Sequence, residues 1–382
     1  MGFHEFSSPY DWSRIAAYKR TAKAAFVGMI DLSVGSPVDP VPDSVRKALA
    51  VAANDPNAYG YPATAGTADL RAAIAEWFSA ARNVDLQAIH ADVVPTVGSK
   101  EGVALMASLL HFGEDDVVVQ PKVSYPTYEI GTQLAGAQVL KVDDVADVAS
   151  WRNVPGVKAV WVNSPCNPTG EVYSAERMAG IVAAVREIGA VVLSDECYAL
   201  MQWRGATNSA DDDPLQSTPC ALRSDVCAGS AEGVLVLYSL SKQSNMAGYR
   251  TAFIAGDESL IASMSAYRKQ IGQIIPGPVQ AAMAAGLRDL ESVKVQHVRY
   301  RERLGVLVSA LRAYGYCTDM PDGALYVWVR AKSGDCWTDM EQLAKIGIIA
   351  SPGEFYGAPE CLRFSATASD EAIASAAERL AR

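Results

Sequence analysis

Short apolar runs alternate with segments of helical hydrophobic spacing along most of this chain. Val234–Leu237 is a run typical of a buried strand. Leu70, Ile74 and Trp77 recur at the spacing of one helix face after Thr67, whose hydroxyl can cap a helix N-terminus. The same reasoning predicts further strands at 117–120, 139–142, 157–163 and 251–257, and helices at 175–187, 258–272, 278–289, 291–315 and 370–380.

Strands that alternate with helices predict an α/β fold, in which a mainly parallel mixed sheet is flanked by helices. The length of 382 residues allows one large and one smaller domain. Because the composition changes after the strands, we place the large domain at residues 31–275. Residues 1–30 together with 276–382 form the expected smaller α+β domain.

Residues 203–232 interrupt the alternation of strands and helices. They are rich in Asp, Ser, Gly and Ala, as in the stretch RGATNSADDDPLQS. This composition predicts a solvated and mobile loop.

Charge and composition restrict the function. The net charge of −10 predicts no general attraction to nucleic acid or to an anionic membrane. The seven cysteines form no CxxC pair and suit a reducing compartment, and the four histidines lack metal-ligand spacing, so we expect no metal site. The N-terminus lacks an apolar leader, and no apolar run approaches the ~20 residues of a membrane helix, which favours a cytoplasmic protein.

A single lysine, Lys242, follows the strand at 234–237 in the sequence SLSKQSNMAGYR. An amine at a strand end, near Ser239, Ser241 and Arg250, suits an aldehyde cofactor that carries a phosphate. The amine would bond to the aldehyde carbon, while the hydroxyls and the guanidinium would hold the phosphate. A surface lysine after a strand is the alternative interpretation of so short a motif.

Two other strand ends carry groups that suit the same ligand. At Gly98 an apolar strand turns into Ser99, Lys100 and an apolar helix, so backbone N–H groups and the helix dipole make an anion site. The spacing matches neither a Walker loop nor a dinucleotide-binding glycine motif. Asp195 ends a buried strand, where a carboxylate is costly unless it meets a cation such as a protonated ring nitrogen.

Together these segments resemble the class I/II aminotransferases, which are pyridoxal 5'-phosphate (PLP) enzymes of fold type I. The resemblance rests on landmarks in the expected order between residues 35 and 363, among them SYPTY, NSPCNPTG and SLSKQSNMAGYR. It implies a PLP-dependent transaminase that acts on amino acids and 2-oxo acids and works as a homodimer.

The resemblance also implies roles for single residues. Lys242 would bond to PLP and carry the proton, and Asp195 would keep the ring nitrogen protonated. Asn167 and Tyr198 would hydrogen-bond the phenolic oxygen of PLP. The segment Gly98, Ser99 and Lys100, together with Ser239, Ser241 and Arg250, would bind its phosphate.

Aromatic and substrate-binding positions follow from the same resemblance. Tyr125 would stack on the ring of PLP, a role for which Tyr128 competes. Tyr61 would reach across a dimer interface to the phosphate in the partner subunit. Gly35 and Asn167 would line the substrate site, and Arg363, which lies among apolar strand residues, would pair with the substrate's α-carboxylate.

The segments DLSVGSPVDPVP and YGYPATAGTADLR are most similar to those of actinobacterial N-succinyldiaminopimelate aminotransferases of lysine biosynthesis. This resemblance implies amino transfer between N-succinyl-LL-2,6-diaminopimelate and 2-oxoglutarate. Arg14, Lys19, Arg20 and Lys23 could meet the distal carboxylates, or they could form an ordinary solvated face.

Three alternatives stay open. Aspartate aminotransferases share many of the motifs, and a PLP-dependent carbon–sulfur β-lyase uses the same lysine and arginine. A PLP-sensing regulator would need a DNA-binding domain and a basic patch, for which the sequence before residue 30 gives no room.

Overall fold

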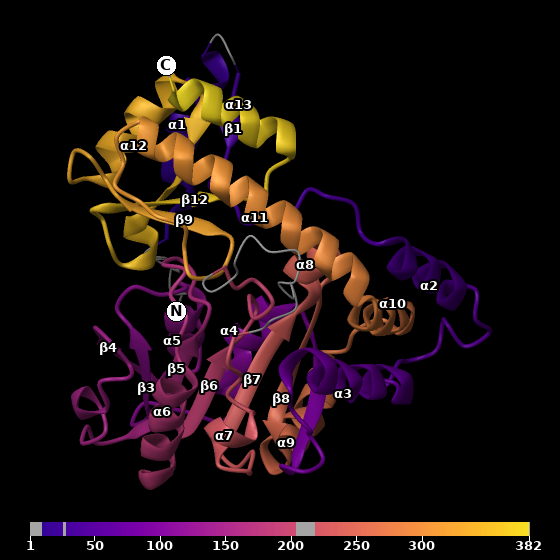
Figure 1. The fold of residues 1–382 in the computed structure, drawn as a ribbon. Coiled ribbons are helices and arrows are strands. Elements are labelled where there is room, and N and C mark those ends of the chain that lie inside the picture. Colours follow the sequence, from indigo (N-terminus) through magenta and orange to yellow (C-terminus); the bar gives the residue numbers. More distant parts are fainter. Residues whose placement is uncertain (1–9, 26–27, 204–217, 382) are drawn as a thin grey trace, which may run out of the picture. The chain divides into compact units, whose positions relative to one another are not determined.

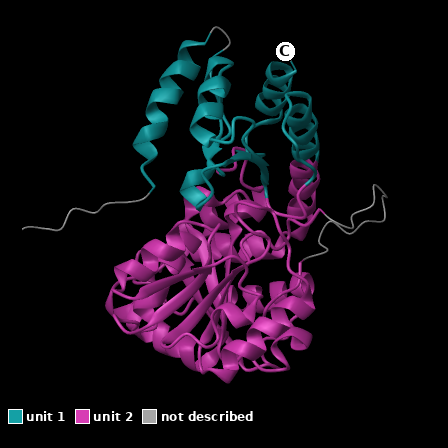
Figure 2. Cartoon of the chain, turned by 90° about the vertical axis from the view of Figure 1, so that its left-hand side faces the viewer, with its two compact units in different colours: residues 1–35, 302–320, 325–382 teal, residues 36–301, 321–324 magenta. Residues whose placement is uncertain are grey.

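The structure is a computed structural model that describes residues 10–25, 28–203 and 218–381. The chain forms two compact units, drawn as a ribbon in Figure 1 and coloured separately in Figure 2. Unit 1 consists of Met1–Gly35, Glu302–Met320 and Leu325–Arg382, and unit 2 consists of Ser36–Arg301 and Pro321–Ala324.

Unit 2 is built on a seven-stranded sheet. In spatial order its strands are β2 (Ala91–Val97), β8 (Thr251–Asp257), β7 (Val234–Ser239), β6 (Val191–Asp195), β5 (Val157–Asn163), β3 (Val117–Pro121) and β4 (Gln138–Val142). All neighbours are parallel except the two pairs that β8 makes with β2 and β7. The predicted α/β fold with a mainly parallel mixed sheet is therefore confirmed.

Helices cover this sheet on both faces (Figure 1). The helices of unit 2 are α2 (Asp43–Ala53), α3 (Ala68–Arg82), α4 (Ser99–Leu109), α5 (Thr127–Leu134), α6 (Ala175–Glu187), α7 (Ser224–Cys227), α8 (Leu240–Gln243), α9 (Glu258–Gln270), α10 (Gly277–Arg288) and the first part of α11 (Leu290–Ala313). Short 3₁₀ turns lie at Val148–Ser150 and Ala247–Tyr249.

The two faces of the sheet explain why its central strands have unbroken apolar sequences. In β7, Val234 and Val236 belong to a hydrophobic cluster with α3, α6 and α10. Leu235 and Leu237, which alternate with them, belong to a second cluster with α4, α5 and α9. Because successive side chains of a strand point to opposite faces, a strand buried on both sides needs apolar residues at every position.

The helix and strand predictions agree closely with the structure. The helices α6 and α13 (Asp370–Leu380) and the strand β8 have the predicted bounds. The hydroxyl of Thr67 accepts a hydrogen bond from the backbone N–H of Leu70 at 3.2 Å and so caps α3.

The compact units divide the chain at 35/36 and 301/302, whereas the predicted domains divide it at 30/31 and 275/276. Helix α10 packs against α2 and α3, and its Met283 and Leu287 are buried in the first hydrophobic cluster. The segment after residue 275 therefore continues the large unit.

The predicted solvated loop at 203–232 is wrong for the part that the structure describes. Trp203 is buried, as are Cys220, Ala221 and Leu222, and α7 follows them. The apolar run 220–222 enters the first hydrophobic cluster, which the overall composition of the segment conceals. Residues 204–217, which carry most of its acidic residues, lie outside the described part of the chain.

Unit 1 contains an antiparallel sheet, β11 (Ser351–Pro352), β12 (Cys361–Ser365) and β9 (Tyr326–Arg330), and a parallel pair, β1 (Ile30–Asp31) and β10 (Ile348–Ile349). Its helices are α1 (Ile15–Ala24), the second part of α11, α12 (Cys336–Lys345) and α13, with 3₁₀ turns at Trp12–Arg14 and Gly353–Tyr356. In the part of the chain that the structure describes, no helix is both long and apolar enough to cross a membrane.

Candidate active site

The strand order of unit 2 brings most of the predicted site residues to one edge of the sheet. The register pairs Asn163 of β5 with Asp195 of β6, and Asp195 with Leu237 of β7. Val97, at the end of β2, pairs with Thr251, at the start of the antiparallel β8. The segments that follow β2, β3, β5, β6 and β7 therefore meet the segment that precedes β8 at the edge where ligands collect in α/β sheets.

An anion cradle lies at the N-terminus of α4. Gly98 precedes this helix with φ of 79°, and Ser99 is its first residue. A Cβ atom at Gly98 would overlap the guanidinium of Arg250, whose Nη1 donates to the carbonyl oxygen of Ala247 at 2.8 Å. Glycine is thus required both by the backbone conformation and by the close approach of the arginine. A guanidinium held beside a helix N-terminus suits a phosphate dianion.

The lysine turn is fixed by its two serines. Ser239 ends β7, and its hydroxyl lies 2.8 Å from that of Ser241 and 3.1 Å from the carbonyl oxygen of Thr251. It also accepts the backbone N–H of Ser241 at 3.1 Å. Lys242 follows in α8 and is half-buried. The serine hydroxyls thereby hold the start of α8 against β8.

Asp195 is a buried carboxylate that accepts hydrogen bonds from Tyr128 and from Cys197. Its Oδ2 accepts from the hydroxyl of Tyr128 at 2.7 Å, and its Oδ1 accepts from the backbone N–H of Cys197 at 3.2 Å. Burial raises the pKa of Asp195, while these hydrogen bonds lower it. A cation placed against this carboxylate, such as a protonated ring nitrogen, would offset the cost of burying it.

The thiol of Cys197 connects the cradle with this carboxylate. Burial and then the charge of Asp195 raise the pKa of Cys197 well above its usual value, while a hydrogen bond with Ser99 lowers it, and the charge of Lys242 lowers it further. Ser99, Asp195 and Lys242 therefore all lie near one thiol. The structure brings these three predicted residues together.

Asn167 and Tyr198 are buried at the same edge. The side chain of Asn163 donates to the carbonyl oxygen of Asp195 at 2.8 Å and accepts the backbone N–H of Asn167 at 2.8 Å. The turn after β5 is thus tied to the end of β6, and Tyr198 follows Asp195 in the next segment.

The two competing tyrosines have different surroundings. Tyr128 is buried, stacks on Trp161 with ring centroids 4.4 Å apart, and donates to Asp195. Tyr125 is half-buried and meets Tyr128 edge to face at 5.7 Å. Because Tyr128 is already stacked on Trp161 and bonded to Asp195, we favour Tyr125 as the tyrosine that stacks on a ligand, and this role stays a prediction.

Three predicted residues are exposed, one of them Arg250, whose guanidinium lies close to Gly98. Lys100 is exposed on the first turn of α4, and Tyr61 is completely exposed, with a relative accessibility of 102%. Neither contributes to the buried cluster within its own chain.

The predicted substrate residues Arg363 and Gly35 form a cluster of their own in unit 1. Arg363 is buried, its guanidinium carbon lies 4.0 Å from the ring centroid of Tyr326 and 4.8 Å from that of Tyr356, and its Nη2 donates to the carbonyl oxygen of Ser33 at 2.8 Å. A Cβ atom at Gly35 would overlap the ring of Tyr326. The tyrosine rings and the glycine therefore fix the plane of the guanidinium, which suits bidentate pairing with a carboxylate.

The sequence interpretation missed two supports of the site. Tyr128 holds Asp195, a role that its position three residues after Tyr125 could have suggested beside stacking. Arg82 of α3 forms a fully buried ion pair with Glu196, the neighbour of Asp195. An arginine in the last turn of an amphipathic helix gives no sequence signal for a buried partner more than 100 positions away.

The geometry of unit 2 fits PLP. The cradle at Gly98 and Arg250 suits a phosphate, the carboxylate of Asp195 suits a protonated ring nitrogen, and Lys242 offers an amine at the same edge. The close approach of Arg250 to Gly98 is the most specific of these features, because any side chain at that glycine would displace the guanidinium.

Comparisons with known proteins agree with this interpretation. Residues 27–380 match the family described as aminotransferase class I and II. The chain is 40% identical over 373 residues to the 4-dedimethylamino-4-oxo-anhydrotetracycline transaminase OxyQ of Streptomyces rimosus, an alignment that covers 97% of this chain and 98% of that protein. It is 39% identical over 377 residues to the probable aminotransferase Rv1178 of Mycobacterium tuberculosis, with 97% of this chain and 84% of that protein covered. Among solved structures, the probable N-succinyldiaminopimelate aminotransferase of Thermus thermophilus matches with a TM-score of 0.84 and 27% identity, covering 97% of this chain and 99% of that one.

The chain belongs to the class I and II aminotransferase family. It is a PLP-dependent transaminase of fold type I.

Proposed function

We propose that this transaminase moves an amino group between N-succinyl-LL-2,6-diaminopimelate and 2-oxoglutarate, and that it does so as a homodimer. When bound, PLP supplies the aldehyde that accepts the amino group and the ring that withdraws electrons from the substrate's α-carbon. The chain's own residues would bind and orient the cofactor and the substrate, and they would move the proton.

Lys242 is the proposed proton carrier. Lys242 is half-buried in α8, and its amine would carry the proton from the substrate's α-carbon to the C4' carbon of the cofactor. Asp195 would remain ionised against the ring nitrogen, and Tyr128 and the N–H of Cys197 hold its two oxygens in place.

The other residues would hold the cofactor. Ser99 and Arg250 would bind its phosphate, together with the neighbouring positions Gly98, Lys100 and the two serines of the lysine turn. Asn167 and Tyr198 would hydrogen-bond its phenolic oxygen, and Tyr125 would lie against its ring. Tyr61 would complete the phosphate site of the partner subunit.

The observation that carries the choice of substrate class is the position of Arg363. A buried guanidinium packed against two tyrosine rings suits a planar carboxylate, as every α-amino acid and 2-oxo acid provides. The name of the Thermus thermophilus neighbour supports the succinylated diaminopimelate in particular.

Two of the four basic residues near the N-terminus that could meet the distal carboxylates already form ion pairs. Arg14 pairs with Glu354, and Lys19 pairs with Asp31 at 2.7 Å. Arg20 and Lys23 are exposed on α1. Of the four basic residues, these last two are the better candidates to meet a remote carboxylate.

The 40% identity to OxyQ favours a second candidate substrate, a multi-ring ketone of the kind that the name of that protein describes. Aspartate remains the simplest alternative amino donor, and β-elimination is the alternative reaction.

A substrate panel tests the proposal. We expect kcat/KM with 2-oxoglutarate as acceptor to be higher for N-succinyl-LL-2,6-diaminopimelate than for aspartate, and amino transfer to the ring ketone to be slower than to 2-oxoglutarate. A tenfold preference for aspartate, about 1.4 kcal/mol of transition-state discrimination, would refute the diaminopimelate assignment. Release of ammonia and pyruvate from a cysteine conjugate, without amino transfer, would instead identify a β-lyase.

A further inference from the structure

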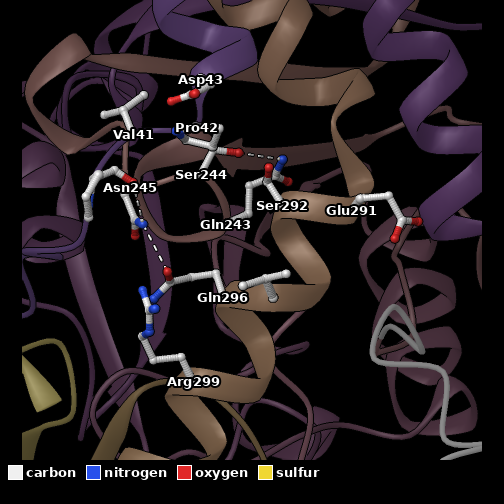
Figure 3. Close-up of a pocket in the computed structure, with 12 residues that line it drawn as sticks. Val41, Pro42, Asp43, Gln243, Ser244, Asn245, Glu291, Ser292, Gln296 and Arg299 are labelled. Atoms are coloured by element: carbon white, nitrogen blue, oxygen red, sulfur yellow. Dashed lines mark hydrogen bonds between the residues drawn. The ribbon is translucent and has the colours of Figure 1, made fainter.

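A pocket of about 490 Å³ lies in unit 2 directly beside the lysine turn (Figure 3). Its walls come from three segments that are far apart in the sequence, namely the loop at 40–43, the residues 243–245 that follow Lys242, and the first turns of α11. The residues drawn in Figure 3 show that Asn245 points toward Gln296 of α11.

A chain of hydrogen bonds joins these segments through Asn245. Its Nδ2 lies 3.3 Å from the carbonyl oxygen of Pro40 and 3.1 Å from Oε1 of Gln296, so it can donate to both. Its Oδ1 accepts from the hydroxyl of Tyr300 at 3.0 Å. Gln296 in turn donates to Asp39 at 2.9 Å. We refer to Asp39, Asn245, Gln296 and Tyr300 as the Asn245 network.

The network is buried on the side of α11, while Asn245 itself is half-buried. Gln296 is 5% exposed and Tyr300 is fully buried. Asn245 itself adopts a left-handed backbone conformation with φ of 55°, which few residues other than glycine and asparagine adopt without strain. Ser244, the residue before it, is also buried, and its N–H closes the turn by donating to the carbonyl oxygen of Leu240 at 3.1 Å.

The members of the network occupy particular places along the chain. Asp39 comes soon after the first boundary between the units, at Gly35 and Ser36. Gln296 and Tyr300 come just before the second boundary, at Arg301 and Glu302. Asn245 follows Lys242 by three positions. One side chain therefore links the lysine turn to the two segments of unit 2 at which the chain passes to and from unit 1.

We propose that Asn245 is a positioning residue for Lys242, which it holds in register with the loop at 39–43 and with α11 through the Asn245 network. The proposal rests on the proposed role of Lys242 as the proton carrier. Since a displacement of about 1 Å at a reacting group can cost on the order of 10²-fold in rate, an anchor of this kind acts on kcat more than on substrate binding.

The test compares three variants in the PLP-loaded protein. Asn245→Ala removes the centre of the network, Gln296→Ala removes one arm, and the double variant removes both. We expect kcat to fall at least about tenfold in each, KM to change less than about threefold, and the double variant to be no worse than Asn245→Ala alone, because coupled residues are not additive. The visible circular-dichroism band of the bound cofactor should change in all three, which a role in stability alone would not produce.

Glu291→Gln is the matched control. Glu291 lines the same pocket but has an 83% exposed side chain that pairs with Lys294 at 2.7 Å, outside the network. This variant should keep the wild-type kcat and dichroism band. Should Asn245→Ala fail to fold, Tyr300→Phe removes one hydrogen bond to Asn245 and keeps the buried ring, and the same loss of kcat is expected in smaller degree.

Additive losses in the double variant, or unchanged kcat and dichroism in Asn245→Ala, would overturn the proposal. Borohydride reduction separates this failure from a failure of the proposed function. If the reduced cofactor is attached to Lys242 while Asn245→Ala behaves as wild type, only the positioning role is wrong. If the cofactor is attached to another lysine, the function proposed for Lys242 is wrong as well.

Discussion

The carboxylate of Asp195 is buried at the position where we propose that PLP binds. Asp195 is 6% exposed, and neither of the partners described for its carboxylate, Tyr128 and Cys197, is a cation. Burial therefore raises its pKa. The cost of burying this carboxylate would be offset by the protonated ring nitrogen of PLP.

We predict that Asp195→Asn stabilises the cofactor-free protein near pH 7. Between the ordinary pKa of an aspartate, about 3.9, and the raised pKa of Asp195, the folded chain keeps a proton that the unfolded chain has released. The free energy of unfolding of the wild type therefore falls as the pH rises through this range, and the variant escapes that loss. We expect a gain of about 0.5–2 kcal/mol at pH 7, which shrinks toward pH 4.

Urea unfolding of both cofactor-free proteins across this pH range measures the difference. In the presence of PLP the order should reverse, since only the wild type offers an anion to the ring nitrogen and gains the full stabilisation of binding. If the cofactor-free variant were less stable than the wild type at every pH, the buried carboxylate of Asp195 would not destabilise the fold.

At the scale of elements, α3 is joined to the end of β6 by the buried pair of Arg82 and Glu196. Glu196 also accepts from Ser194 at 2.9 Å and from the backbone N–H of Ala221 at 2.8 Å, and Arg82 donates to the carbonyl oxygen of Thr218 at 2.9 Å. The ion pair and these hydrogen bonds therefore join three segments, namely the end of α3, the end of β6 and residues 218–221.

Arg82→Ala should lower the free energy of unfolding by about 3–5 kcal/mol, because it leaves the carboxylate of Glu196 buried without its cation. The matched control is Arg152→Ala, which removes an exposed pair with Glu187 and should cost less than about 1 kcal/mol. Denaturant unfolding of the two variants decides the matter, and similar losses in both would contradict a special role for the buried pair.

Most elements could be predicted from the sequence because the apolar pattern is regular where a strand or helix is buried. The bounds of α6, β8 and α13 follow directly from it. The segment 218–232 could not be predicted, since three apolar residues at 220–222 are outweighed by the polar composition around them. The partnership of Tyr128 with Asp195 depends on the order of β3, β5 and β6 in the sheet, which no local pattern contains.

At the scale of the whole molecule, the complete exposure of Tyr61 suits a residue that acts outside its own chain. Its neighbour Tyr59 is 89% exposed as well. Exposure of two large aromatic rings to water is unfavourable, and burial in an interface would remove this cost. A two-fold dimer would bury the same patch on both subunits.

We predict that the active protein is a homodimer and that Tyr61→Phe weakens PLP binding by about tenfold without dissociating the dimer, since it removes one hydrogen bond to a charged group. Analytical ultracentrifugation combined with cofactor titration tests both parts. A fully active monomer would refute the dimer, and unchanged PLP affinity in the variant would remove Tyr61 from the phosphate site.

Chemical reduction tests whether Lys242 is the lysine that bonds to PLP. The PLP-loaded protein is reduced with borohydride and digested, and the peptides are analysed by mass spectrometry. The mass of the reduced cofactor should appear on the peptide that contains Lys242, and it should be missing from Lys242→Ala, which should also have no measurable transaminase activity. A cofactor attached to Lys100 or to any other lysine, or a Lys242→Ala variant that retains near-normal amino transfer, would contradict the role proposed for Lys242.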